Sequence, residues 1–140
     1  MSEEIGARPD LRTPYERIGG QAAVRQLVDR FYDQMSSRPE ARTIRHLHAE
    51  DLQGARDKLF KFLSGWLGGP NLYIEEFGHP RLRMRHLPFS IGAEERDQWM
   101  DCMAASLEEV VADARLRKGL MEAFAQTANH MINRFEPNQD

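Results

Sequence analysis

Apolar residues recur at steps of three and four along several stretches of the chain, the spacing of one face of an α-helix. The pattern predicts a helix from about Gln21 to Ser37, whose apolar face is formed by Val24, Leu27, Val28, Phe31 and Met35. Gly68-Gly69-Pro70 end a second such stripe, made of Ala55, Leu59, Phe62, Leu63 and Trp66. Two further long helices carry Trp99, Met103, Leu107 and Val110, then Leu116, Leu120, Phe124, Met131 and Phe135. The fold class is therefore all-α.

Shorter elements are indicated by capping and breaking residues. Thr13-Pro14-Tyr15-Glu16 has a capping threonine, proline at the first helical position and glutamate three residues after the cap, so a short helix starts there and stops at Gly19-Gly20. Between residues 71 and 79 the apolar residues follow neither the helical spacing nor the alternation typical of a strand. Leu72-Tyr73-Ile74 is only weak evidence for a strand. Pro80 then allows a short helix that ends at His86, because Pro88 follows it closely.

Length and composition narrow the function classes. A chain of 140 residues is the size of one domain, which we expect over residues 13–135, between a mobile tail at 1–12 and a C-terminal tail at 136–140. The net charge of −3 is scattered without a basic stripe, so nucleic acid is not an expected partner. The single cysteine excludes an internal disulfide, and neither a signal peptide nor a membrane-spanning run is apparent. We expect a cytoplasmic protein that does not contact membranes.

Five histidines are candidate metal ligands, but they are not equivalent. His130 lies off its helical stripe and is expected to face solvent, while His79 precedes a proline in a polar loop. His46 and His48 form an H-x-H pair in a polar connector, yet no other ligand, H-E-x-x-H or C-x-x-C accompanies them, which argues against zinc. Cys102 lies in a helical run without a basic activator, so it is not an expected nucleophile.

His86 differs in its surroundings, because arginines alternate with apolar residues before it: Arg81, Leu82, Arg83, Met84 and Arg85. Leu87, Phe89 and Ile91 follow it. A flat apolar cofactor with anionic edges would suit this pattern, and so would a histidine at the edge of the core with solvated arginines. Tyr32, beside a buried face, and Trp99 are hydrogen-bond donors that either bond a nearby carbonyl or point into a cavity.

Several motifs, taken in order, resemble the truncated haemoglobins over about residues 13–133. They are Tyr15-Glu16-Arg17-Ile18-Gly19-Gly20, Phe31-Tyr32, Phe62-Leu63 with Gly68-Gly69-Pro70, and Gly78-His79-Pro80-Arg81-Leu82-Arg83-Met84-Arg85-His86-Leu87-Pro88-Phe89 with Trp99. Trp99 and the tyrosine after G-G-P are similar to the group II, or O-type, branch.

The resemblance implies a two-over-two helical sandwich around haem b. His86 would be the proximal iron ligand, and Tyr32, Trp99 and His48 would stabilise a bound ligand on the distal side as hydrogen-bond donors. A one-residue shift of the connector would put Leu47 in the distal pocket in place of His48. The remaining positions that it implies are Ala55 and Leu59 as distal lining, Arg85 and Tyr73 as haem-propionate contacts, and Phe62, Leu63, Phe89 and Met84 as further haem contacts.

The implied function is reversible binding of oxygen, and of carbon monoxide and nitric oxide, with slow oxygen release caused by two or three distal hydrogen-bond donors. A second hypothesis is a haem redox enzyme acting on peroxide or nitrogen oxides, with sulfide as a further ligand. It would need a separate reductase, because the sequence contains no flavin or nicotinamide domain. A third is a helical interaction module with a vestigial haem site. We expect a monomer or a homodimer.

Overall fold

The computed structural model describes residues 11–133, and within this range all regular elements are helices, as predicted. They are α2 (Pro14–Ile18), α3 (Gln21–Ser37), the 3₁₀-helix η1 (Pro39–Ala41), α4 (Arg42–His46), α5 (Gln53–Trp66), α6 (Leu72–Phe77), α7 (Leu82–His86), α8 (Ala93–Val110) and α9 (Ala114–Met131). The tails predicted at 1–12 and 136–140 lie outside this range, apart from residues 11 and 12, as does Phe135.

The first helix begins at the capping residues that the sequence indicated. The Thr13 hydroxyl accepts from the Glu16 backbone N–H at 3.1 Å, and the Glu16 carboxylate accepts from the Thr13 N–H at 2.9 Å. This reciprocal capping box satisfies two backbone donors that the first turn would leave unpaired. Gly19 and Gly20 both have positive φ angles, of 122° and 76°, which only glycine adopts without strain. The chain can therefore end α2 and enter α3 at once.

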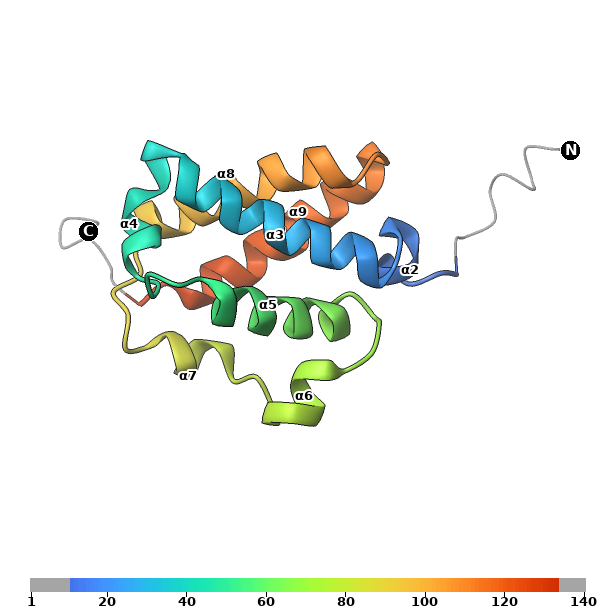
Figure 1. Cartoon of the computed structure of the whole chain (residues 1–140), viewed down its shortest axis with the longest axis horizontal. Coiled ribbons are helices and arrows are strands. Elements are labelled where there is room, and N and C mark those ends of the chain that lie inside the picture. The colour runs from blue at the N-terminus through green and yellow to red at the C-terminus, as the bar shows by residue number, and fades with distance from the viewer. Residues whose placement is uncertain (1–10, 134–140) are drawn as a thin grey trace, which may run out of the picture.

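The four long helices form two packed pairs. Helix α3 packs against both α5 and α8, and α8 packs against α9, so the pair of α3 and α5 lies over the pair of α8 and α9 (Figure 1). A short loop joins α8 to α9, whereas η1 and α4 lie between α3 and α5 along the chain, and α6 and α7 between α5 and α8. In the same view α6 and α7 lie on the far side of α5. Within residues 11–133 no helix is long and apolar enough to cross a bilayer.

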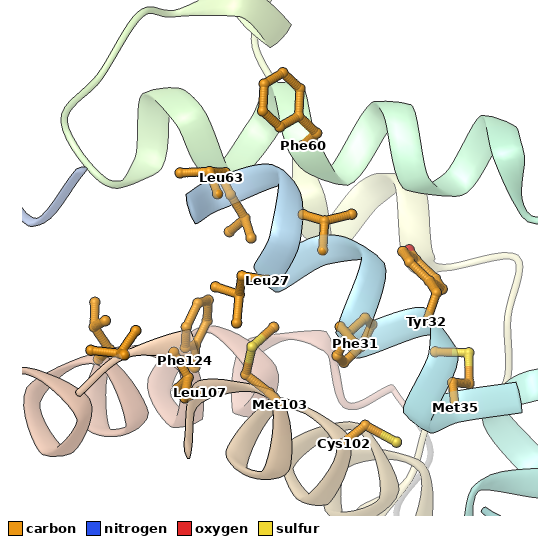
Figure 2. Close-up of a cluster of buried hydrophobic side chains, with 14 of the residues drawn as sticks. Leu27, Phe31, Tyr32, Met35, Phe60, Leu63, Cys102, Met103, Leu107 and Phe124 are labelled. Carbon is orange, nitrogen blue, oxygen red and sulfur yellow. The ribbon is translucent and has the colours of Figure 1, made fainter. Parts of the chain in front are cut away.

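The core lies where the apolar stripes meet, in the space between α3, α5, α8 and α9 (Figure 2). Leu27 and Phe31 of α3 and Met103 of α8 are fully buried, and Leu63 of α5 and Phe124 of α9 are nearly so. Burying a side chain of this size contributes about 1.5–3 kcal/mol. The helical periods in the sequence therefore identified the contacts that hold the sandwich together.

The loop after α5 packs closely against the start of the chain. A Cβ atom on Gly69 would overlap the Tyr15 ring, and the Tyr15 N–H donates to the Leu67 carbonyl at 2.9 Å. Gly68 has a positive φ of 95° and lies against Thr13. The two glycines therefore do more than end a helix, because they allow α2 to dock on the end of α5.

Three short elements were missed from the sequence. The segment from 71 to 79, expected to be irregular, contains α6, and the polar connector after Pro39 contains η1 and α4. Each has six residues or fewer, less than two helical turns, so no repeat of the apolar spacing can show. Leu72, Tyr73 and Ile74 are consequently helical, which removes the weak alternative of a strand.

Candidate functional site

Helix α7 carries His86 and begins at a backbone conformation uncommon for a non-glycine residue. Arg81, its N-cap, has φ +48° and ψ 53°, in the left-handed region. The neighbouring His79 stabilises this turn, because its Nδ1 accepts a hydrogen bond from the Arg81 backbone N–H at 3.1 Å. His79 is exposed, so the structure confirms the turn role expected for it. Such strain is kept where the surrounding structure fixes a segment firmly.

The His86 ring is oriented by its own helix. Its Nδ1 lies 2.6 Å from the Leu82 carbonyl oxygen one turn earlier. A carbonyl can only accept, so Nδ1 carries the proton and Nε2 keeps its lone pair. This is the arrangement in which a histidine binds a metal through Nε2, since the second hydrogen bond fixes both the tautomer and the ring.

The chain on either side of His86 is fastened to the end of α9. The Asn133 side-chain amide donates to the carbonyls of His86 at 3.1 Å and Phe89 at 2.8 Å, and its oxygen accepts from the Ile91 N–H at 2.9 Å. The Asn133 N–H donates to the Ile91 carbonyl at 2.8 Å, and Arg83 donates to the Ile132 carbonyl at 3.0 Å. Asn133 therefore positions the segment that carries His86.

His86 borders a cavity of about 210 Å³ between α3, α5, α7, α8 and α9. Six of the residues selected from the sequence line it or border it: Tyr32, His48, Leu59, Phe62, His86 and Trp99. The structure thus brings together side chains that are up to 67 positions apart in the sequence, Tyr32 and Trp99. Most of the remaining wall is apolar and comes from Ile44, Leu47, Leu82, Ile91, Ala128 and Met131.

Tyr32 and Trp99 present hydrogen-bond donors to this cavity. The Tyr32 hydroxyl and the Trp99 indole N–H form no hydrogen bond with another group within residues 11–133. Every buried side-chain nitrogen and oxygen in this range has a hydrogen-bond partner, so these two atoms are not enclosed by protein on all sides. Both polar atoms must therefore reach the open space. Burial raises the pKa of Tyr32 far above its ordinary value, although Arg56, whose guanidinium lies 5.8 Å from the ring centre, opposes this effect. The hydroxyl consequently stays protonated and able to donate.

His48 is the third polar side chain at the cavity. Its Nδ1 donates to the Ile44 carbonyl at 2.8 Å, and its ring meets that of Tyr32 edge-on, with centroids 5.7 Å apart. Burial is the main cause that lowers its pKa, opposed by the bond to Ile44. The ring is therefore neutral near neutral pH, with an accepting Nε2. Leu47 lines the same cavity, so both sequence alternatives for this position reach it.

The other selected residues lie outside the cavity wall. Leu63 is buried in the core, Ala55 packs against that core, and Met84 and Phe89 are exposed by 58% and 41%. The Tyr73 ring lies 6.2 Å from the ring of Phe62, which lines the cavity. Arg85 is exposed, its guanidinium lies 5.9 Å from the centre of the Tyr73 ring, and its Nε donates to the Pro80 carbonyl.

Large apolar side chains are exposed on one segment of the molecule. Apart from Leu11, all those found within residues 11–133 lie between 74 and 89, on α6, α7 and the following loop: Ile74, Phe77, Met84, Leu87 and Phe89. An apolar patch of this kind marks a surface that a ligand or partner covers. Met84, Leu87 and Phe89 lie within three residues of His86 in the sequence, although none of the five exposed residues lines the cavity itself.

Several cavity residues were not selected from the sequence, notably Glu95, Arg96 and Thr127. Glu95 is 5% exposed and accepts from the Gly92 N–H at 2.7 Å at the start of α8. Its position one turn before Trp99 on the same helix is the signal that could have identified it. Asn133 had no such signal, because its contacts span more than forty residues.

Two other sequence predictions are confirmed in this region. His130 is exposed, and Cys102 is buried in α8, where burial is the main cause that raises the pKa of its thiol to about 11. A thiol with this pKa is not a nucleophile at neutral pH.

The family of the chain follows from comparison with known proteins. The model of the bacterial-like globin family matches residues 13–133. A group 2 truncated haemoglobin of Bacillus subtilis is 42% identical over 126 residues, which cover 90% of this chain and 92% of that protein. The chain belongs to the group II truncated haemoglobins. The resemblance of its motifs in the sequence is thereby confirmed.

Solved structures of other truncated haemoglobins share the fold of this globin. The cold-adapted truncated haemoglobin of the Antarctic marine bacterium Pseudoalteromonas haloplanktis is 46% identical, with a TM-score of 0.87, over 89% of this chain and 100% of that chain. The truncated oxygen-avid haemoglobin of Bacillus subtilis is 42% identical, with a TM-score of 0.78, over 87% and 100%. The two-over-two sandwich predicted from the sequence is confirmed.

Proposed function

We propose that this globin holds haem b through Nε2 of His86 and binds oxygen, and likewise carbon monoxide and nitric oxide, beside Tyr32 and Trp99. The observation that carries the proposal is the convergence on one cavity of the His86 imidazole, oriented by the Leu82 carbonyl, and two hydrogen-bond donors without a protein partner. The oxygen-avid relative from Bacillus subtilis supports the same ligand.

The residues present suit haem better than a bare metal ion. Within the described part of the chain no three histidine, cysteine or acidic side chains gather as ligands, and the two imidazoles at the cavity, His48 and His86, are fewer ligands than a bare ion needs. Haem needs only one imidazole, because the porphyrin supplies four ligands itself. The apolar patch between 74 and 89 suits a flat apolar body that is larger than the cavity alone.

The rim beside α7 suits the anionic edge of haem. Arg85 uses Nε for the Pro80 carbonyl, which leaves its two terminal nitrogens for a carboxylate. The Tyr73 ring, against this guanidinium, links the rim to Phe62 in the cavity wall. We assign Arg85 and Tyr73 to the propionates, and Phe62, Phe89 and Met84 to the faces and edge of the porphyrin.

Haem, when bound, supplies the ferrous iron at which a diatomic ligand is held. The chain contributes two neutral donors, the Tyr32 hydroxyl and the Trp99 indole N–H, in a site whose walls are largely apolar. Donors fixed in a medium of low dielectric constant stabilise negative charge on a ligand more strongly than they would in water. We therefore infer slow oxygen release.

His48 takes a different role from the one expected. Because its Nδ1 proton is used by the Ile44 carbonyl and its pKa is lowered, its Nε2 accepts near neutral pH. We infer that His48 accepts a hydrogen bond from a ligand proton, and that it does not donate to the ligand until it is protonated.

Titration of the purified full chain with haem tests the proposal. We expect a Soret band that saturates at one haem per chain, and a shift of the band when oxygen or carbon monoxide is added to the reduced protein. A protein that leaves added haem in the spectrum of free haem would contradict the proposal and favour the helical interaction module.

A further inference from the structure

Both tryptophans of the chain lie against the same phenylalanine, at opposite ends of one aromatic column. The Trp66 ring is stacked on Phe124 at a centroid distance of 4.6 Å and an angle of 19°. On the other side, Phe124 meets the edge of Trp99 at 5.6 Å. Phe124 is 2% exposed, so no water separates the three rings at their centre.

The ends of this column, hereafter the Trp66–Phe124–Trp99 column, border two different cavities. Trp99 borders the cavity of His86, whereas Trp66 borders a second cavity of about 340 Å³ between α2, the end of α5 and the start of α9. Indole is the most easily oxidised ring among the natural side chains apart from phenol, and contact between rings favours electron transfer. The column therefore connects the proposed haem site to a distant solvent-accessible surface.

The second cavity combines an apolar floor with two guanidinium groups. Trp66, Leu116 and Leu120 supply apolar surface, while Arg17 and Arg115 lie at its border. Arg17 is paired with Asp113 at 3.5 Å, and Arg115 is exposed. A small aromatic molecule with a negatively charged group matches this surface, because its ring can lie on Trp66 while its charge pairs with arginine.

We propose that Trp66 is a surface oxidation site, at which a small phenol bearing a carboxylate gives up an electron that travels through the Trp66–Phe124–Trp99 column. The inference rests on the proposed haem binding, because peroxide, the oxidant, reacts at the haem. For each peroxide the O–O bond breaks and two water molecules form. Two phenols each lose the electron and proton of an O–H bond and become phenoxyl radicals, which balances the reaction.

The charges around Trp66 determine the form of its oxidised ring. Positive guanidinium groups disfavour a positively charged indole, so loss of an electron is accompanied by loss of the indole N–H proton to water in the second cavity. The phenol then returns one hydrogen atom to this neutral indolyl radical. Trp99 borders the His86 cavity instead, whose lining residues include one arginine, Arg96, where the second cavity has Arg17 and Arg115.

The relay is tested by freeze-quench electron paramagnetic resonance on the haem-loaded full chain mixed with hydrogen peroxide. We expect a tryptophanyl radical whose hyperfine pattern narrows when the tryptophans carry deuterated rings. Trp66→Phe should remove at least four-fifths of this signal, and Phe124→Leu should reduce it several-fold. Phe60→Leu, which removes a ring of equal size from a buried position outside the column, should leave it unchanged.

Other outcomes overturn the relay. A tyrosyl radical alone, an unchanged tryptophanyl radical in Trp66→Phe, or no reaction with peroxide would each contradict it. The Soret band of each variant separates the two proposals: a chain that takes up no haem refutes both, whereas a haem-loaded chain without the Trp66 radical refutes only the relay. Trp66→Phe keeps a stacking ring on Phe124, so it should fold even where Phe124→Leu does not.

The substrate class is tested with two phenols of opposite charge. In steady-state turnover with peroxide, Arg115→Gln should raise the KM for hydroxyphenylpropionate by about two- to fivefold, the effect of an exposed ion pair, and leave the KM for the cationic phenol tyramine unchanged or lower. Lys118→Gln removes the same charge one turn along α9, outside the cavity, and should alter neither. An equal effect of both substitutions, or none, would contradict binding at this cavity.

Discussion

Removal of the Tyr32 hydroxyl should accelerate oxygen release while leaving the stability of the protein almost unchanged. Tyr32 is 5% exposed, yet its hydroxyl forms no hydrogen bond within residues 11–133 and reaches the cavity. Tyr32→Phe therefore leaves no protein group without a partner. Only a hydrogen bond to a ligand is lost, which is the condition under which a substitution acts on binding and not on folding.

The size of the effect follows from the energy of one neutral hydrogen bond. Such a bond contributes about 1 kcal/mol net, which corresponds to about a fivefold increase in the release rate. Trp99→Phe removes the second donor and should have an effect of similar size. Phe31 contacts both rings, with centroids 5.0 Å from Tyr32 and 5.2 Å from Trp99, and the two rate factors multiply when the two hydrogen bonds contribute additively. The double variant should release oxygen about 25-fold faster.

Stopped-flow displacement of oxygen by carbon monoxide measures this rate in the wild type, the two single variants and the double variant. Tyr15→Phe is the matched control, because Tyr15 lies outside the His86 cavity and packs against the Gly69 loop. Urea unfolding of Tyr32→Phe should give a free energy within about 0.5 kcal/mol of the wild type.

Release rates that are unchanged in the double variant would refute the assignment of both donors. An acceleration in Tyr15→Phe equal to that in Tyr32→Phe would show that loss of any tyrosine hydroxyl disturbs the fold, and would refute the argument from position.

Further predictions concern the docking of α2 and the buried His48. Gly69→Ala should lower the free energy of unfolding by about 1–3 kcal/mol, because the added methyl overlaps the Tyr15 ring. Gly119→Ala, inside α9 with open space at its Cβ, should instead raise the free energy of unfolding by about 0.5–1 kcal/mol. Equal effects of the two substitutions in urea unfolding would contradict this prediction. In the folded protein the pKa of His48 lies below its ordinary value of 6.5, mainly because the ring is buried. As the pH falls below about 6.5, the unfolded chain therefore binds more protons than the folded protein does. The free energy of unfolding consequently decreases in acid. His48→Phe should flatten this decrease, measured as the urea midpoint between neutral and mildly acidic pH. His130→Phe, at an exposed position, should not, and a decrease of equal size in both variants would exclude His48 as its source.

The sequence predicted the long helices well, because each keeps one apolar face over three or more turns. Leu27 and Phe31 on one helix, and Met103 and Leu107 on another, follow that spacing, and all four are buried in the core. Capping residues predicted the first helix equally well, since the contacts of Thr13 and Glu16 are local. Helices α4 and α6 could not be predicted, because they are too short to show a period.

The candidate site was only partly readable from the residues themselves. His86 could not be separated from a core-edge histidine by composition, and its resemblance to a family motif gave it a role. The hydrogen bond to Leu82 and the cavity shared with Tyr32 give that role physical support. The bonds of Asn133 to the segment after His86 bridge distant parts of the chain, so no local pattern predicted them.

The accepting state of His48 was also beyond the sequence. The sequence predicted a donor at this position, but the direction of its hydrogen bonding depends on the Ile44 carbonyl, which takes the Nδ1 proton. Burial then keeps the ring neutral by lowering its pKa. Both facts depend on the local helix and the packed cavity, which a list of residue types does not contain.

The most direct test of the central claim is haem binding by His86→Gly, with and without free imidazole, followed by the Soret band and resonance Raman spectra. Because His86→Gly removes the imidazole that the Leu82 carbonyl orients, it should abolish the iron–histidine stretching band and weaken haem affinity at least tenfold. Free imidazole, which can occupy the space of the lost ring, should restore both. His130→Gly, at an exposed position, serves as the control. An unchanged iron–histidine band in His86→Gly would contradict the account.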